Sequence, residues 1–182
     1  QGGVELGTVQ IAEHLTENGI RNYVASQGGR MEFQLERMGV KHFKLPLKSK
    51  NPFKIFQNAD KLAEIIKKEG INIVHARSRA PAWSAYLAAK KAGVHYMTTF
   101  HGTYGLGPKG LKKLYNQVMT FGEKVIVISS HIKRHVLENY HTPEEKLVFI
   151  HRCVDVEKFN PAAVTPERLK TMIEQYELPT DK

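Results

Sequence analysis

Residues Ile71–Gly102 read INIVHARSRAPAWSAYLAAKKAGVHYMTTFHG, and this stretch decides the fold. A short apolar run, INIVHA, is followed by an amphipathic helical pattern, and Gly93 separates that pattern from a second run, HYMTTF. Short apolar runs are typical of strands that helices cover on both faces. Glycine directly after a helix adopts the left-handed conformation at little cost. The stretch therefore predicts a strand, a helix and a second strand.

The same order of helix, glycine, aliphatic residue and strand recurs along the chain. Other helical patterns end at Gly19-Ile20, Gly39-Val40 and Gly70-Ile71. Further strand-like runs are RNYVAS, KHFKLP, KVIVIS and KLVFIH. Alternating strands and helices need crossover connections, which make the strands parallel. We therefore predict an α/β fold: a Rossmann-like doubly wound parallel sheet with helices on both faces.

Apolar residues at helical spacing predict which helix faces are buried. Trp83, Tyr86 and Leu87 are expected to be core residues of the helix that follows INIVHA. Three further faces consist of Thr8, Ile11, Ala12 and Leu15; of Ala59, Leu62, Ala63 and Ile66; and of Leu111, Leu114, Tyr115 and Val118.

The composition indicates one globular domain of ordinary size. The chain has 182 residues, of which 41% are hydrophobic and 25% charged. No apolar run approaches the roughly 20 residues that span a bilayer, and the first residues lack the basic and apolar regions of a secretion signal. Cys153 is the one cysteine in the sequence. No internal disulfide is therefore expected, and a reducing, cytoplasmic location fits.

The charge balance is strongly basic and uneven. The sequence holds 27 Lys and Arg against 18 Asp and Glu, a formal net charge of +9. Part of the excess lies in two clusters of lysines. Lysine clusters attract phosphates, nucleic acid or an anionic membrane surface, although a solvated lysine-rich face without a partner explains them equally well. The lysines concerned are Lys48, Lys50 and Lys54, with Phe53 and Phe56 between them, and Lys109, Lys112 and Lys113.

Polar loops follow several predicted strands, and ligands of parallel sheets bind beyond the carboxyl ends of the strands. Arg77 and Arg79 suit a phosphate or carboxylate. His101 offers a hydrogen bond to a sugar or phosphate, with Gly102 leaving room beside it. Surface salt bridging and a structural histidine are the alternative interpretations.

Two glycine pairs precede predicted helices. Gly2-Gly3 lets backbone N–H groups approach an anion at a helix N-terminus, but a plain turn explains it as well, and for Gly28-Gly29 the turn is the stronger interpretation. No dinucleotide-binding glycine fingerprint, phosphate-binding P-loop or nucleophile motif is present. Because no His, Cys or Asp set has ligand spacing, no metal site is expected.

In this order, the segments resemble the N-terminal domain of family 4 glycosyltransferases, which have the GT-B architecture. The resemblance covers nearly the whole chain. The segment containing Arg77 and Arg79 is similar to a subgroup of bacterial enzymes that build lipopolysaccharide or other surface glycans. The matching segments are GGVELGTVQIAEHLTENG, INIVHARSRAPAWSAYLAAKKAGV, TTFHG, KVIVISSHIKRHV and VFIHRCVDVEKFNP.

The resemblance implies two Rossmann-like domains that face each other, with the nucleotide-sugar held mostly by the C-terminal one. The parent enzyme would transfer a sugar with retention and without a metal or other cofactor. In this chain Gly2, Gly3 and Arg152 would lie near the donor diphosphate, and His101 would contact the donor sugar. Cys153 replaces the family's usual glycine, which leaves the role of Arg152 open.

By the same resemblance the acceptor site would lie on this domain. The acceptor would be a glycan or a lipid-linked glycan, and the lysine clusters would bind the inner face of an anionic membrane peripherally. The residues that would border the acceptor are Arg77, Arg79, Gly102 and Ser129.

The family's first strand and donor domain have no counterpart in the sequence. We therefore expect a Rossmann-like domain over residues 1–160, a connector over 161–182, and an inactive chain with an exposed His101. Two other functions remain open: a polyanion- or nucleic-acid-binding domain without activity, and half of a GT-B-type sugar-nucleotide epimerase. The first lacks a nucleic-acid-binding motif, and the second lacks a carboxylate pair for acid–base chemistry.

Overall fold

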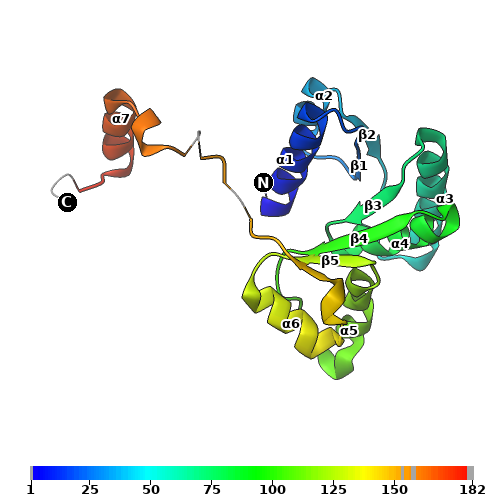
Figure 1. Cartoon of the computed structure of the whole chain (residues 1–182). Coiled ribbons are helices and arrows are strands. Elements are labelled where there is room, and N and C mark those ends of the chain that lie inside the picture. The colour runs from blue at the N-terminus through cyan, green and yellow to red at the C-terminus, as the bar shows by residue number, and fades with distance from the viewer. Residues whose placement is uncertain (1, 153, 157–158, 180–182) are drawn as a thin grey trace. The chain divides into compact units, whose positions relative to one another are not determined.

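The computed structural model describes residues 2–152, 154–156 and 159–179. The chain divides into two compact units, residues 1–151 and 152–182. The first unit contains all the described strands and most of the helices (Figure 1).

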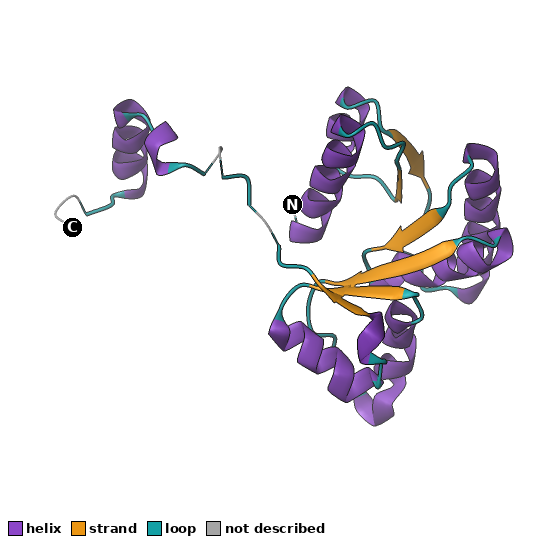
Figure 2. Cartoon of the chain, in the orientation of Figure 1, coloured by secondary structure: helices purple, strands orange, loops and turns teal. Residues whose placement is uncertain are grey.

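The first unit is built on a parallel four-stranded sheet in the order β3-β4-β5-β6. The strands are β3 (Ile73–Ala76), β4 (His95–Phe100), β5 (Lys124–Val127) and β6 (Leu147–Phe149). Each strand pairs in parallel with the next one along the chain, and a helical connection lies between each pair (Figure 2). The parallel α/β prediction is therefore confirmed, and HYMTTF forms β4 with the predicted bounds.

Two further strands form a separate parallel pair, β1 (Tyr23–Ser26) with β2 (Lys41–Lys44). Among the strands that the structure describes, β1 bonds only to β2, and β3 bonds only to β4. The predicted doubly wound arrangement is thus present as two sheets. After β2 the chain continues through α3 (Pro52–Glu69) to β3, the first strand of the four-stranded sheet.

The helices of the first unit end where the glycines predict. Gly70 and Gly93 take left-handed conformations, with φ of 64° and 68°, after α3 and α4 (Arg79–Ala92). The Asn51 side chain caps the start of α3 by accepting bonds from two backbone N–H groups. The other α-helices of this unit are α1 (Gly3–Glu17), α2 (Glu32–Arg37), α5 (Leu111–Asn116) and α6 (Ser130–Tyr140). Short 3-10 turns are η1 (Pro108–Gly110), η2 (Gln117–Thr120) and η3 (Glu144–Lys146).

One apolar cluster joins α4, η2 and α6 to the four-stranded sheet. Phe100, Val118, Met119 and Val127 are completely buried in it. A second cluster packs α1 and α2 on β1, and a third lies between α3 and α4. Because α3 contacts α4 along its length, the third cluster connects the helices of the two sheets.

Three of the four predicted helix faces need correction. On α4, Trp83, Tyr86 and Leu87 are half-buried instead of forming the core, because alanines occupy most of the buried positions of that helix. Ala59, Leu62, Ala63 and Ile66 of α3 are buried as predicted. By contrast, Leu111 and Leu114 are 68% and 63% exposed. The reason is that α5 ends at Asn116 and continues as the tighter turn η2, which directs Val118 and Met119 inward in their place. In α1, Val9 and Ala12 are buried, whereas Ile11 is 43% exposed.

The second unit contains the turn η4 (Pro161–Ala163) and the helix α7 (Pro166–Tyr176). The Thr165 side chain caps α7 by accepting a bond from the Arg168 N–H. The helices in the described ranges include none that is both long and apolar enough to cross a bilayer.

Replacing Phe100 with alanine tests the core. Its ring lies 5.1 Å from that of Tyr104 and 5.7 Å from that of Tyr140, centroid to centroid. Loss of this side chain leaves a cavity and should lower the free energy of unfolding by about 3–5 kcal/mol, as measured by urea denaturation. Phe53→Ala is the matched control, since Phe53 is 70% exposed, and should change it by less than about 0.5 kcal/mol. Equal effects of the two variants would contradict this core assignment.

Candidate functional site

Three basic side chains gather at the carboxyl ends of β3 and β4. His75 lies near the end of β3, Arg77 follows that strand, and His101 follows β4. The Nε2 atom of His75 is 2.7 Å from the Thr99 hydroxyl of β4, which links the two strand ends. His75 also feels the charges of Arg77 and His101. The edge that the sequence predicts as a binding site is therefore electropositive.

His75 is held in its neutral form. Burial, together with the nearby charges of Arg77 and His101, lowers the pKa of this imidazole from 6.5 to about 4. A neutral imidazole can both donate and accept a hydrogen bond, so it can hold the Thr99 hydroxyl without adding charge to the edge.

The Arg79 side chain is held by contacts with other residues of the site. Its guanidinium donates to the Asn116 side-chain oxygen at 3.1 Å and lies 4.4 Å from the centre of the Tyr104 ring. The Asn116 amide in turn donates to the Gly105 carbonyl and to the Tyr140 hydroxyl, both at 3.2 Å. Arg79 therefore holds α4 against the loop that follows His101.

His101 differs from the expectation of an exposed side chain. The residue is half-buried and both of its ring nitrogens are buried. The reason is the folded loop beyond it, in which Tyr104 stacks on Phe100 at 5.1 Å between ring centroids. Burial raises the pKa of the Tyr104 hydroxyl, while Arg79 and a hydrogen bond from the His101 backbone oppose that change. A side chain at Gly102 would meet no atom within 4 Å, so there is space beside His101.

The glycine pair before α1 faces a carboxylate of the chain itself. Gly2 is the N-cap of α1, and its N–H donates to Glu5 Oε2 at 3.2 Å. The Glu5 carboxylate therefore occupies the position near Gly2 and Gly3 that an anion would take at this helix end. A bound diphosphate would require Glu5 to turn away.

The second glycine pair forms a tight turn, as the stronger interpretation predicted. Gly29 donates to Glu32 Oε1 at 2.6 Å, and Gly28 donates to the Ser26 hydroxyl at 3.0 Å. The bond from Gly29, together with Lys44, lowers the pKa of Glu32. Ser26 also bonds to His42 Nε2 at 2.8 Å. These contacts fix the turn to β1 and β2.

The remaining predicted residues are spread over the two units. The Ser129 hydroxyl caps α6 by accepting from the Ile132 N–H at 3.2 Å. Arg152 is exposed and belongs to the second unit, where Cys153 lies outside the described residues. Among the lysines, the side chain of Lys109 is likewise not described; Lys48, Lys50, Lys54 and Lys112 are exposed and Lys113 is half-buried. Within the described ranges, no three His, Cys, Asp or Glu side chains converge as metal ligands do.

A family model decides the affiliation of the chain. The model of Glycosyltransferase Family 4 matches residues 1–158. The chain belongs to Glycosyltransferase Family 4. No curated protein matches the chain.

Solved structures agree with this family 4 assignment. A glycosyltransferase from Rickettsia africae ESF-5 is 45% identical, with a TM-score of 0.86, over 100% of this chain and 48% of that one. Anabaena Alr3699/HepE in complex with UDP and glucose shares the fold, with a TM-score of 0.72 at 17% identity over 96% of this chain and 47% of that one. The lipopolysaccharide outer core galactosyltransferase WaaB has a TM-score of 0.63 at 18% identity, over 85% and 43%. The family 4 chain thus spans about half the length of these proteins.

Two polar residues of the candidate site, His75 and Asn116, were given no role from the sequence, although His75 begins a segment expected at the binding edge. His75 lies inside a strand-like run, whose pattern predicts a core position for it. Asn116 lies inside a helical pattern. Asn116 is completely buried and Thr99 is 3% exposed. The position of His75 just before a strand end was a usable signal, whereas the burial of Asn116 depends on contacts with Arg79 and Tyr140, far away in the sequence.

The pKa of His75 can be measured by NMR titration of its imidazole signals. We expect a value of about 4, against 6.5 for an ordinary histidine. Because the unfolded chain then binds a proton that the folded chain does not, the free energy of unfolding should fall as the pH is lowered from about 6.5 towards 4. The loss should be about 2–3 kcal/mol. A fitted pKa above 6 would contradict the buried, neutral assignment, and His75→Gln should remove this part of the pH dependence.

Proposed function

We propose that this chain is the N-terminal, acceptor-side half of a retaining glycosyltransferase that moves a hexosyl group from a nucleotide-sugar to a glycan or lipid-linked acceptor. The observation that carries the proposal is the family match over residues 1–158 together with 45% identity to a Rickettsia glycosyltransferase. That relative is about twice as long, since the chain covers 48% of it. The second half would supply most of the donor site.

The electropositive edge supports this role. His101 would contact the donor sugar, with Gly102 leaving space for it, and Gly2, Gly3 and Arg152 would lie near the diphosphate. Positive groups and the α1 N-terminus would stabilise the leaving diphosphate as charge develops on it, with no metal ion or other cofactor. The complexes of HepE with UDP and with UDP-glucose support a uridine nucleotide as the donor's leaving group.

The acceptor would lie along the ends of β3, β4 and β5, bordered by Arg77, Gly102 and Ser129. Arg79 would contribute by holding the loop after His101, because its guanidinium is already bound to Asn116 and stacked on Tyr104. The similarity to WaaB supports an acceptor in lipopolysaccharide or surface polysaccharide synthesis.

An acceptor of this kind would bring the protein to the inner face of a membrane. The exposed lysines of the two clusters would then bind anionic headgroups peripherally, each adding about 1 kcal/mol near the surface.

A non-enzymatic polyanion-binding function is favoured by one observation, the net charge of +9. A gel-shift experiment with random RNA at moderate salt distinguishes the two functions. A polyanion-binding protein should retard the RNA band, whereas a membrane-bound glycosyltransferase should not.

The His101 variant tests the proposed donor contact in the complete protein. His101→Ala should lower kcat by about 100-fold or more, as loss of one preorganised hydrogen-bonding group does, and it should leave the domain folded by circular dichroism. His95→Ala is the control, because His95 begins the same strand at its opposite end and is exposed. If the two variants retained equal activity, or if His101→Ala unfolded the domain, the assigned role would be wrong.

The chain by itself should be inactive. It should release no measurable transfer product from UDP-glucose or other nucleotide-sugars with a glycan acceptor, because most of the donor contacts belong to the other half. The measurement is a radiolabelled-sugar transfer experiment with the purified chain, and clear turnover would refute the division of roles between the two halves.

A further inference from the structure

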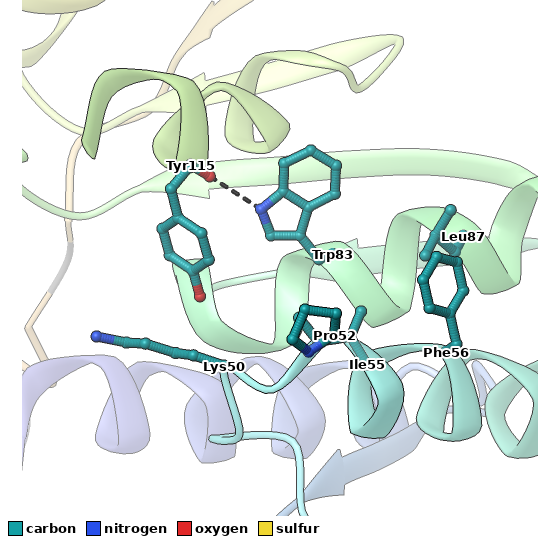
Figure 3. Close-up of a pocket in the computed structure, with 7 residues that line it drawn as sticks. All are labelled: Lys50, Pro52, Ile55, Phe56, Trp83, Leu87 and Tyr115. Carbon is teal, nitrogen blue, oxygen red and sulfur yellow. Dashed lines mark hydrogen bonds between the residues drawn. The ribbon is translucent and has the colours of Figure 1, made fainter. Parts of the chain in front are cut away.

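An apolar cavity of 290 Å³ lies between α3, α4 and α5 (Figure 3). Pro52, Ile55 and Phe56 come from the first turns of α3, and Trp83 and Leu87 come from α4. The core face of α4 is filled by alanines in the adjoining cluster, so its larger side chains line this cavity instead.

The walls of the cavity suit an alkyl chain. Their exposed area is almost entirely apolar, and Lys50 is the charged residue that lines it. A sugar or nucleotide needs several converging polar groups, which this lining does not provide. The volume is at the lower end of the range for ligand sites, about 300 Å³, and so fits one narrow chain.

A polar group stands at one end of the cavity. Trp83 donates its indole N–H to the Tyr115 backbone carbonyl at 3.0 Å, which holds the indole ring against α5. The Tyr115 hydroxyl is buried and has no hydrogen-bond partner among the residues that the structure describes. In Figure 3 this hydroxyl is directed toward α3, on the side where Lys50 lies. Hydroxyl and ammonium donors at one end of an apolar cavity match an amphiphile with an anionic head.

The surface around the cavity carries large exposed apolar side chains. Phe53 and Phe56 on α3 are 70% and 54% exposed, and Leu111 and Leu114 on α5 are 68% and 63% exposed. Isolated exposed apolar residues are common, but large ones that line or adjoin one cavity mark an interaction surface. Leu111 and Leu114 are the residues of α5 whose predicted burial was wrong.

The charge at the Lys50 end of the cavity is positive. Residues 41–59 and 70–122, which contain every residue of its lining, include no Asp or Glu. The next acidic residue along α3, Asp60, lies one turn beyond Phe56, and its carboxylate is paired with Lys91. Lys48, Lys54 and Lys112 are exposed near Lys50 and Tyr115 in the sequence. A protein partner with an ordinary mixed surface would gain little from this arrangement, whereas an anionic bilayer offers both negative charge and acyl chains.

We propose that this cavity binds one acyl chain of an anionic phospholipid in a bilayer, with Lys50 and the Tyr115 hydroxyl holding the phosphate. The proposal rests on the membrane association proposed above but not on sugar transfer. It specifies where the protein enters the membrane: at the start of α3 and at α5.

Trp83 reports directly on the proposed site, because it is the one tryptophan in the sequence. The experiment titrates the purified chain with vesicles of phosphatidylglycerol that carry bromine on their acyl chains, a contact quencher of indole fluorescence. We expect strong quenching of Trp83 by brominated phosphatidylglycerol, little by brominated phosphatidylcholine, and no competition by inorganic phosphate. Sedimentation with the vesicles measures binding separately.

Two variants distinguish the contribution of the cavity to lipid binding from that of the lysine charges. Leu87→Phe narrows the cavity and keeps it apolar, so quenching should fall while sedimentation changes little. Lys50→Gln with Lys54→Gln should weaken vesicle binding by about 10-fold or more. The matched control removes the same charge from the other end of α3, by Lys67→Gln with Lys68→Gln, and should have a smaller effect.

The outcomes distinguish the proposals. Vesicle binding without quenching of Trp83 would overturn the acyl-chain site and leave peripheral association standing. Failure to bind the vesicles would overturn both, and glycosyl transfer would still be tested by His101. Quenching that is equal with neutral and anionic lipid, or a concentration-dependent dimer that buries Trp83 without lipid, would also overturn the proposal.

Discussion

The buried amide of Asn116 is the contact on which the arrangement of the candidate site depends. This side chain is completely buried, and it accepts from Arg79 while it donates to the Gly105 carbonyl and the Tyr140 hydroxyl. A buried amide that loses its partners costs about 1–3 kcal/mol. The three partners come from α4, from the loop after β4 and from α6. One side chain thus holds together the elements that surround His101.

The same region carries an unusual charge distribution. The absence of acidic residues from 70 to 122 leaves His75, Arg77, Arg79 and His101 without a carboxylate from that segment. Because burial keeps His75 neutral, the edge concentrates its positive charge in the arginines, where bidentate contacts with phosphate or carboxylate are strongest. A surface with these properties suits anionic ligands, and the donor diphosphate of the proposed function is such a ligand.

The sequence predicts the elements better than it predicts their contacts. Gly70 and Gly93 mark helix ends because a positive φ is a local requirement, and β4 has its predicted bounds because the run HYMTTF lies between the turn at Gly93 and the loop that begins at His101. Leu111 and Leu114 were placed in the core because helical spacing assumes that the helix continues, whereas α5 changes to a 3-10 turn after Asn116. The partners of Asn116 and the burial of His101 arise from the loop beyond β4, and no local pattern encodes them.

In the proposed function, a sugar bound for transfer lies at the carboxyl end of β4, beside Gly102. The most direct test is a crystal structure of the complete protein with a bound nucleotide-sugar. We expect the donor sugar to lie within hydrogen-bonding distance of the His101 imidazole, about 3 Å, in the space that Gly102 leaves open. A donor sugar bound elsewhere, with His101 packed away from it inside the domain, would contradict the proposed role of His101.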